Sequence, residues 1–302
     1  EDRIFGIPKI MFPYLNLYLL QALIYFIIKK EKDKINELEL VRFIMFWMVN
    51  NPDSKKSSES SKEVIKLLDE GKSLVDIYNG LTKVREEHKN LFFKLIIFKD
   101  KSVEFSNMRN QDERALEYFS ERNKELYQKF STNISLLLWI QREFISNNEA
   151  ISNYEPLAIH NEDNVPYDFD HLVPQSNWSS LSTNGAGLDK IKENKEKFGN
   201  LWIRRSLGNL IGNYRVLASS TNRSRGDKSL EEEFEKFEND NNFILFKEDL
   251  KDWKEASPQN KFEWNDNRVQ KFQYVIEKRV LDLYHKIIDD LEFEQWNKHD
   301  TI

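Results

Sequence analysis

The segment YDFDHLVPQS, residues 167–176, places two acids and a histidine side by side and ends a strand-like run with a proline. An imidazole has a pKa near neutrality, so His171 can take a proton from water. Carboxylate and amide oxygens suit a hard divalent cation such as Mg²⁺ or Mn²⁺. Together these groups indicate hydrolysis of a phosphodiester, which needs an activated water and neutralisation of the phosphate charge.

Two further segments follow in the chain, LGNLIGNYRVL at 207–217 and SSTNRSRGDK at 219–228. Asn222 comes after a strand-like run and a cluster of hydroxyl residues, which is typical of the start of a helix. A helix start also favours a negatively charged ligand. Asp170 and His171 are consecutive and would point to opposite faces of an extended strand. They can share one centre only if the strand ends or twists there, and Pro174 is consistent with such an end.

Positive charge gathers around these segments although the chain as a whole has a net charge of −6 and a pI near 5.6. Residues 188–228 contain ten Lys and Arg against four acids. A solvated helix face would account for the lysines at 190–197, but not for arginines clustered around the motif. Phosphate contact accounts for them. The predicted DNA-binding residues are Arg204, Arg205, Arg215, Arg223, Arg225 and Lys228.

Composition excludes several classes of protein. The acidic average argues against a generally basic protein that coats nucleic acid. The absence of cysteine excludes disulfides and cysteine-based zinc sites, and it fits a cytoplasmic protein. The start at Glu1 suggests a fragment of a longer chain. The apolar run at 10–28 is interrupted by Pro13, Asn16 and Gln21, so we expect a buried helix there and no membrane span.

The hydrophobic periodicity and the composition along the chain predict a mainly α protein in three parts. Residues 1–150 are expected to form a helical domain, with the Ser-rich stretch 50–63 as a loop. Residues 151–230 form a small mixed insertion with strands at 171–173 and 214–218. Residues 231–302 return to helix, and the amphipathic stretch 262–293 is expected to pack back on the scaffold.

Taken in order, these segments resemble the HNH nucleases, which have the ββα-metal or His-Me finger fold. The wider pattern is similar to modification-dependent restriction proteins of the GmrSD type. It covers roughly residues 133–290 and is specific only as an ordered set. Its other parts are LLLWIQREFI at 136–145 and a C-terminal pattern of Trp264, Phe272, Gln273, Arg279, Leu283 and Tyr284.

The resemblance implies a role for each matching residue. His171 would be the general base, and Asp170 and Asn222 would hold Mg²⁺ or Mn²⁺. Asn213 would brace the loop around the base. Asn209 competes for that role because the Gly-Asn pair occurs twice, and Asn213 is preferred because it directly precedes the second strand. The third motif position is Asn rather than the His of the family name, as in many such nucleases.

The resemblance also implies a context. The substrate would be DNA, the setting bacterial anti-phage restriction in the cytoplasm, and a ParB-like NTPase domain would lie upstream on this or another chain. No P-loop is visible in this sequence. Two alternatives stay open. One is a catalytically inactive HNH-fold module that binds nucleic acid, and the other is a helical interaction module.

Finer expectations concern the neighbours of these residues. Asp168 is expected to order the hairpin, and Gln141 to lie in a buried hydrogen-bonded network. If residues 222–225 form a helix, Asn222 and Arg225 share a face. Arg225 would then bind a phosphate beside the metal, and Arg223 would pair with an acid on the scaffold.

Overall fold

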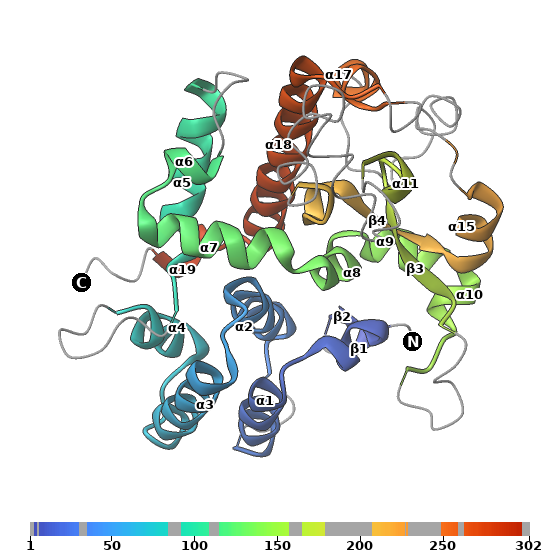
Figure 1. The fold of residues 1–302 in the computed structure, drawn as a ribbon. Helices are drawn as coiled ribbons and strands as arrows, with labels where there is room; N and C mark the ends of the chain where they lie inside the picture. The colour runs from blue at the N-terminus through green and yellow to red at the C-terminus, as the bar shows by residue number, and fades with distance from the viewer. Residues whose placement is uncertain are drawn as a thin grey trace.

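The computed structural model describes residues 3–4, 6–29, 35–83, 92–108, 115–156, 165–178, 207–226, 228, 249–258 and 263–297 (Figure 1). This part of the chain is mainly helical, as expected. It also contains two small antiparallel strand pairs. One pair, β1 (Arg3–Ile4) with β2 (Ile7–Pro8), lies at the N-terminal end, and the other carries the candidate site.

The N-terminal helices pack around one buried helix, α2. Its residues from Leu40 to Asn50 are all buried, and Asn36 caps its start by accepting from two backbone N–H groups. The elements here are η1 (Lys9–Tyr14), α1 (Leu17–Lys29), α2 (Glu37–Asn50), α3 (Ser54–Asp69) and α4 (Leu74–Thr82).

The prediction of a loop at residues 50–63 is wrong, because most of this stretch belongs to α3. Asp53 caps the helix by accepting from the N–H of Lys56. Ser57, Ser60 and Ser61 are buried, and α3 packs closely against α1 and α4. Small side chains allow helices to approach each other, so packing overrides the low helix propensity of serine.

Helix α1 buries only one side, on α3. Its inner residues Leu19, Leu23 and Phe26 are buried, whereas Leu17, Ile24 and Ile28 are exposed. The expectation of a buried helix is therefore met only on the inner side of α1. Among the residues that the structure describes, no helix has the length and apolar character needed to cross a membrane.

The middle of the chain supplies further helices of 3 to 14 residues between the N-terminal helices and the site. They are α5 (Leu95–Met108), α6 (Ala115–Tyr118), α7 (Glu121–Thr132), η3 (Ile134–Leu136), α8 (Leu137–Ile140), α9 (Arg142–Asn147) and α10 (Glu149–Ser152). At the junction of α8 and α9, the Gln141 side chain accepts from the N–H of Val216 at 2.7 Å. The buried bonding expected for Gln141 is therefore present, and it satisfies the backbone N–H of Val216.

The long helix α18 (Asp266–Asp290) joins the scaffold to the site, as Figure 1 shows. On the scaffold side, Tyr284 donates its hydroxyl to the carbonyl of Leu95 at 2.9 Å. On the site side, the fully buried Arg279 donates to the carbonyls of Gly212 and Tyr214, both at 2.8 Å. The C-terminal helix thus packs back on the earlier part of the chain, as expected.

In the second strand pair, β4 has the predicted limits, whereas the first strand ends at His171, where the sequence predicted it to begin. Strand β3 (Tyr167–His171) pairs antiparallel with β4 (Tyr214–Ala218), and α15 (Ser219–Arg225) follows β4 directly. Figure 1 shows this unit on the side of the molecule away from α3 and α4. The remaining elements are α11 (Gln175–Trp178), η4 (Ile211–Asn213), α17 (Asp249–Ala256) and α19 (Glu294–Asn297).

Candidate functional site

The strand register decides which candidate side chains share a face. Asp170 lies opposite Arg215, and His171 lies opposite Tyr214. Side chains alternate along a strand, so Asp168 and Asp170 share one face of the pair and His171 takes the other. Helix α15 covers the face of the two acids, because Asn222 bonds Asp168 and Arg225 bonds Asp170. Along the strand the side chains of Asp170 and His171 therefore diverge, and the chain bends directly after them at Leu172 and Val173.

Asp170 is enclosed by two arginines. Its Oδ1 accepts from the Arg225 guanidinium at 2.7 Å, and its Oδ2 accepts from Arg225 at 2.9 Å and from Arg215 Nε at 2.7 Å. The Asp170 side chain is only 8% exposed, and the arginine side chains are 4% and 2% exposed. These are buried charge-assisted hydrogen bonds, which are shorter and stronger than neutral ones.

Arg225 also holds the backbone beyond β3. Its guanidinium donates to the carbonyls of His171 at 2.9 Å and Leu172 at 3.0 Å. The expectation that Arg215 and Arg225 contact DNA directly is therefore wrong for this structure, since both are buried in protein contacts. Arg223, expected to pair with the scaffold, is exposed instead.

Of the other predicted DNA-binding residues, one lies at the surface and two lie outside the described residues. Lys228 is exposed. Arg204 and Arg205 lie outside the described residues. Arg223 and Lys228 are therefore the predicted DNA-binding residues that the structure leaves at the surface.

Asn222 lies inside α15 rather than at its start, because the helix begins at Ser219. Its amide nitrogen donates to Asp168 Oδ2 at 3.1 Å. Both residues are half-buried. Asp168 therefore contacts the residue that the family pattern pairs with Asp170. Within the described ranges, no group of three acidic, histidine or cysteine residues is arranged to hold a metal ion.

His171 sits in an aromatic setting at the end of β3. Its ring lies 4.1 Å from the Tyr214 ring centroid and 5.3 Å from that of Trp178. Burial lowers the pKa of His171 to about 4, although the nearby carboxylate of Asp170 and a hydrogen bond with Asn209 act in the opposite direction. The imidazole is therefore neutral at pH 7.

One nitrogen of His171 is left over. Nε2 is shielded from solvent and has no hydrogen-bond partner among the described residues. A neutral ring protonated on Nδ1 would carry its lone pair on Nε2, which is the tautomer that a general base requires.

Asn213 braces the loops on both sides of His171. It is fully buried, its Oδ1 accepts from the N–H of Val173 at 3.0 Å, and its Nδ2 donates to the carbonyl of Gly208 at 3.0 Å. Asn209 is exposed, and its side chain accepts from the Tyr214 hydroxyl at 3.2 Å. The two Gly-Asn pairs thus differ in position: one asparagine holds the backbone and the other contacts the histidine.

The glycines of these pairs are required for close packing. A Cβ at Gly208 would lie 2.5 Å from the Trp178 ring, and a Cβ at Gly212 would lie 2.2 Å from the carbonyl oxygen of Ile276 on α18. The two Gly-Asn pairs therefore mark two close contacts of the segment 207–213, which packs beside His171 and is called the His171 loop below. One contact is with Trp178 and the other is with the C-terminal helix α18.

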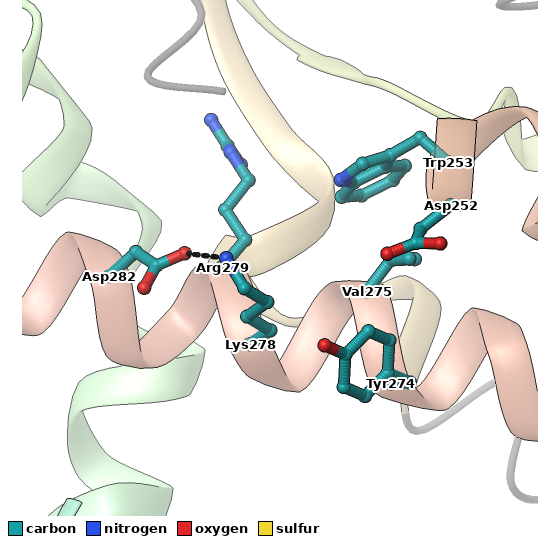
Figure 2. A pocket seen from close by; sticks show the side chains of 7 residues that line it. All are labelled: Asp252, Trp253, Tyr274, Val275, Lys278, Arg279 and Asp282. Atoms are coloured by element: carbon teal, nitrogen blue, oxygen red, sulfur yellow. Dashed lines mark hydrogen bonds and ion pairs between the residues drawn. The ribbon is translucent and has the colours of Figure 1, made fainter. Parts of the chain in front are cut away.

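A small pocket lies elsewhere, between α17 and α18 (Figure 2). Trp253, Tyr274 and Arg279 are among its lining residues, and Lys278 pairs with Asp282 at its edge at 3.0 Å. None of the residues predicted to bind metal or DNA lines it. We therefore assign it no part in the candidate chemistry.

Comparison with known proteins finds no matching family model, no matching characterised protein and no matching solved structure. The chemistry of the site therefore has to be inferred from its residues.

Two residues that contact the His171 ring were not predicted from the sequence to belong to the site. Trp178 contacts both Gly208 and the His171 ring, and Tyr214 stacks on that ring. Tyr214 could have been found, because it directly follows Asn213 at the start of the predicted strand. No local signal identifies Trp178, because its contact with Gly208 links distant parts of the chain.

The pKa of His171 predicts how folding depends on pH in metal-free protein. Below pH 6.5 the unfolded chain binds a proton that the folded protein resists until about pH 4. Stability should fall as the pH drops through this window, and His171→Gln should make the fall shallower. His285, whose pKa is also lowered by burial, contributes equally to both proteins. Urea unfolding at about pH 7 and pH 4.5, in chelator, measures the difference. Equal losses in both proteins would contradict a depressed His171 pKa.

Proposed function

We propose that this chain is a metal-dependent endonuclease that hydrolyses phosphodiester bonds in DNA, as its resemblance to the HNH nucleases implies. The state of His171 is the observation that supports this most. Its ring is neutral at pH 7 because burial lowers its pKa to about 4. Its Nε2 has no hydrogen-bond partner among the described residues. A held, neutral imidazole with a lone pair left over can serve as a general base.

Bound DNA would supply two conditions that His171 needs to act as a general base, namely a higher pKa and access for water. An imidazole with a pKa of about 4 is a weak base on its own. The negative charge of a bound phosphate favours the protonated ring and raises its pKa toward neutrality. Nε2 is shielded from solvent, so the attacking water has to enter as the surrounding side chains move. Base strength and access would then both depend on bound DNA.

The chain's oxygen ligands fit a magnesium ion in part. Asp168 has a carboxylate, and Asn222 has an amide whose nitrogen donates to it, so the amide would have to turn to present its oxygen to an ion. Mg²⁺ commonly takes one or two carboxylates and keeps several waters. When bound, the ion would neutralise phosphate charge and stabilise the leaving oxygen. Both oxygens of Asp170 accept from arginines, so this carboxylate would have to share an ion with Arg215 and Arg225.

The exposed basic residues would bind the DNA backbone. Arg223 lies on α15 and Lys228 follows that helix, and both are exposed. Cations at such positions bind phosphates without reading sequence. The proposed setting in cytoplasmic anti-phage restriction, and an upstream ParB-like NTPase partner, rest on the resemblance alone.

The second candidate function is an HNH-like module that binds nucleic acid without cutting it. The enclosure of Asp170 favours this candidate, because the carboxylate expected to hold the metal is occupied by Arg215 and Arg225. A module of this kind would keep the exposed basic residues and lose the ion.

Cleavage of plasmid DNA tests the proposal. Plasmids with plain or modified cytosine are incubated with the chain in Mg²⁺, Mn²⁺ or chelator, and DNA binding is measured in parallel. Nicked or linear products should form only with the ion, and chelator should leave the melting temperature unchanged because the helical scaffold does not depend on metal. Cleavage in chelator would contradict the metal requirement. DNA binding without cleavage under every condition would favour the second candidate.

Arg223→Ala should weaken DNA binding about equally for all sequences. Loss of one phosphate contact lowers the slope of log affinity against log salt by roughly one ion. Arg225→Ala is the matched comparison, because it removes a buried arginine from the same helix and should mainly lower the melting temperature. A salt series of DNA affinities measures both. A larger loss of slope for Arg225→Ala would contradict the observed helix orientation.

A further inference from the structure

The ring of Tyr214 lies against the ring of His171. The two residues are directly opposite each other on β4 and β3. Side chains that are directly opposite in an antiparallel pair lie on the same face and contact each other. The two ring centroids are 4.1 Å apart, and the ring planes are tilted by 38°. Tyr214 therefore covers one face of the imidazole and limits how far that ring can turn out of its plane.

A hydrogen bond at the hydroxyl of Tyr214 adds a second restraint. This hydroxyl donates to Asn209 Oδ1 at 3.2 Å. The Asn209 side chain also forms a hydrogen bond with the His171 ring. A ring contact restrains the plane of an imidazole, whereas a hydrogen bond restrains rotation within that plane, because such bonds weaken when they are misaligned. Tyr214, Asn209 and His171 thus form a closed set of contacts that restrains the imidazole in both respects.

A second aromatic neighbour of the imidazole is held by the protein core. Trp178 is buried, its Nε1 donates to the carbonyl of Val173 at 2.9 Å, and its ring centroid lies 5.3 Å from that of His171. Tyr214, in contrast, is only half-buried. A half-buried side chain removes less apolar surface from water than a buried one. Replacing Tyr214 should therefore disturb the orientation of the imidazole more than the fold.

We propose that Tyr214 is a positioning residue for the general base: its ring and its bond to Asn209 keep the His171 imidazole in the orientation from which it takes a proton from water. This inference rests on the proposed nuclease function. A general base works only within hydrogen-bond reach of the proton that it takes, and a misplacement of about 1 Å can cost about 10²-fold in rate. Tyr214 needs no contact with DNA for this role.

The kinetics of DNA cleavage by two variants of Tyr214 test the role. Tyr214→Leu removes the ring contact and the hydroxyl, so it should lower kcat about 10²-fold and leave KM within about twofold of the parental value. Tyr214→Phe keeps the ring contact and should lower kcat only about three- to tenfold, the usual effect of losing one neutral hydrogen bond. A parental kcat in Tyr214→Leu would overturn the proposal.

Tyr274→Leu is the matched control for a change that only weakens the fold. Tyr274 is also half-buried, and it lines the pocket between α17 and α18, which none of the predicted site residues lines. Its replacement should lower the melting temperature at least as much as Tyr214→Leu does, while kcat stays at the parental value once the folded fractions are matched. An equal fall in kcat for both variants would overturn a specific role for Tyr214.

Nuclear magnetic resonance of the imidazole rings gives a readout that does not depend on cleavage. The chain has five histidines, which are labelled with ¹³C at ring Cε1, and His171→Gln identifies the signal of His171. The order parameter of that ring should fall from about 0.85 in the parent to below about 0.6 in Tyr214→Leu, and Tyr214→Phe should stay near the parent. An unchanged order parameter in Tyr214→Leu overturns the role of Tyr214 and leaves the nuclease standing. A parent chain that cuts no DNA, with the order parameter falling as expected, overturns the nuclease and keeps Tyr214 as the residue that orients this ring.

Discussion

Replacing His171 with alanine is expected to slow DNA cleavage by about 10²–10⁴-fold, the usual cost of losing a general base. DNA binding should change little. The pKa of His171 is about 4, so the ring is uncharged at pH 7 and its loss removes no positive charge from the surface. Single-turnover cleavage and DNA affinity, both measured at pH 7 with Mn²⁺, report the two effects separately.

His285→Gln is a suitable control for the loss of a histidine. His285 lies on α18, where its ring contacts Ser102 of the scaffold, and it belongs to none of the candidate segments. This variant should cleave at about the parental rate once its folded fraction is matched. If His171→Ala cleaves like the parent, His171 is not the base.

Replacing Gly212 with alanine is expected to cost about 3 kcal/mol of folding free energy, at the upper end of the usual range for overpacking. The new Cβ would lie 2.2 Å from the carbonyl oxygen of Ile276 and 2.9 Å from Val280 Cγ2. The first of these is helix backbone and cannot rotate away. Thermal melting should show a decrease of roughly 6–12 °C.

Gly80→Ala is the matched control for this prediction. Gly80 lies within α4, and its added Cβ would meet only the end of the Leu67 side chain, at 3.3 Å. Alanine stabilises a helix interior by roughly 0.5–1 kcal/mol relative to glycine, so the melting temperature should stay level or rise. Similar losses for both variants would mean that the contact between Gly212 and α18 is not what matters.

The sequence predicted the elements of the candidate site better than their contacts. The limits of β4 at 214–218 match the prediction, because an apolar run with β-formers is a local signal. The short helix after it was also expected. Its inward face could not be predicted, because the helix starts at Ser219, three residues before Asn222, and buries Arg225. Periodicity alone relates Asn222 to Arg225 but does not show which acid lies beneath each.

The main errors concern pairings between distant parts of the chain. Asp170 and Arg225 are far apart in sequence, and an acid beside a histidine resembles a metal ligand until its partner is known. The Ser-rich stretch 50–63 has the composition of a loop, and only its burial against α1 and α4 explains why it is helical. The C-terminal pattern was recognised as an ordered set, and its residues prove to be buried, with Arg279 holding the backbone next to Asn213.

The contacts of α18 with Gly212, made by Arg279 and by the backbone of Ile276, have a consequence for the synthesis of this protein. A ribosome delivers residues 167–226 before residue 279, so the base and its loop exist for a time without Arg279 or the surface that receives Gly212. A nascent chain, or one cut short by a premature stop or a protease, would carry every candidate catalytic residue and still lack the support that organises them. The proposed DNA-cutting activity would therefore arise only after Arg279 has been synthesised and α18 has packed on the His171 loop.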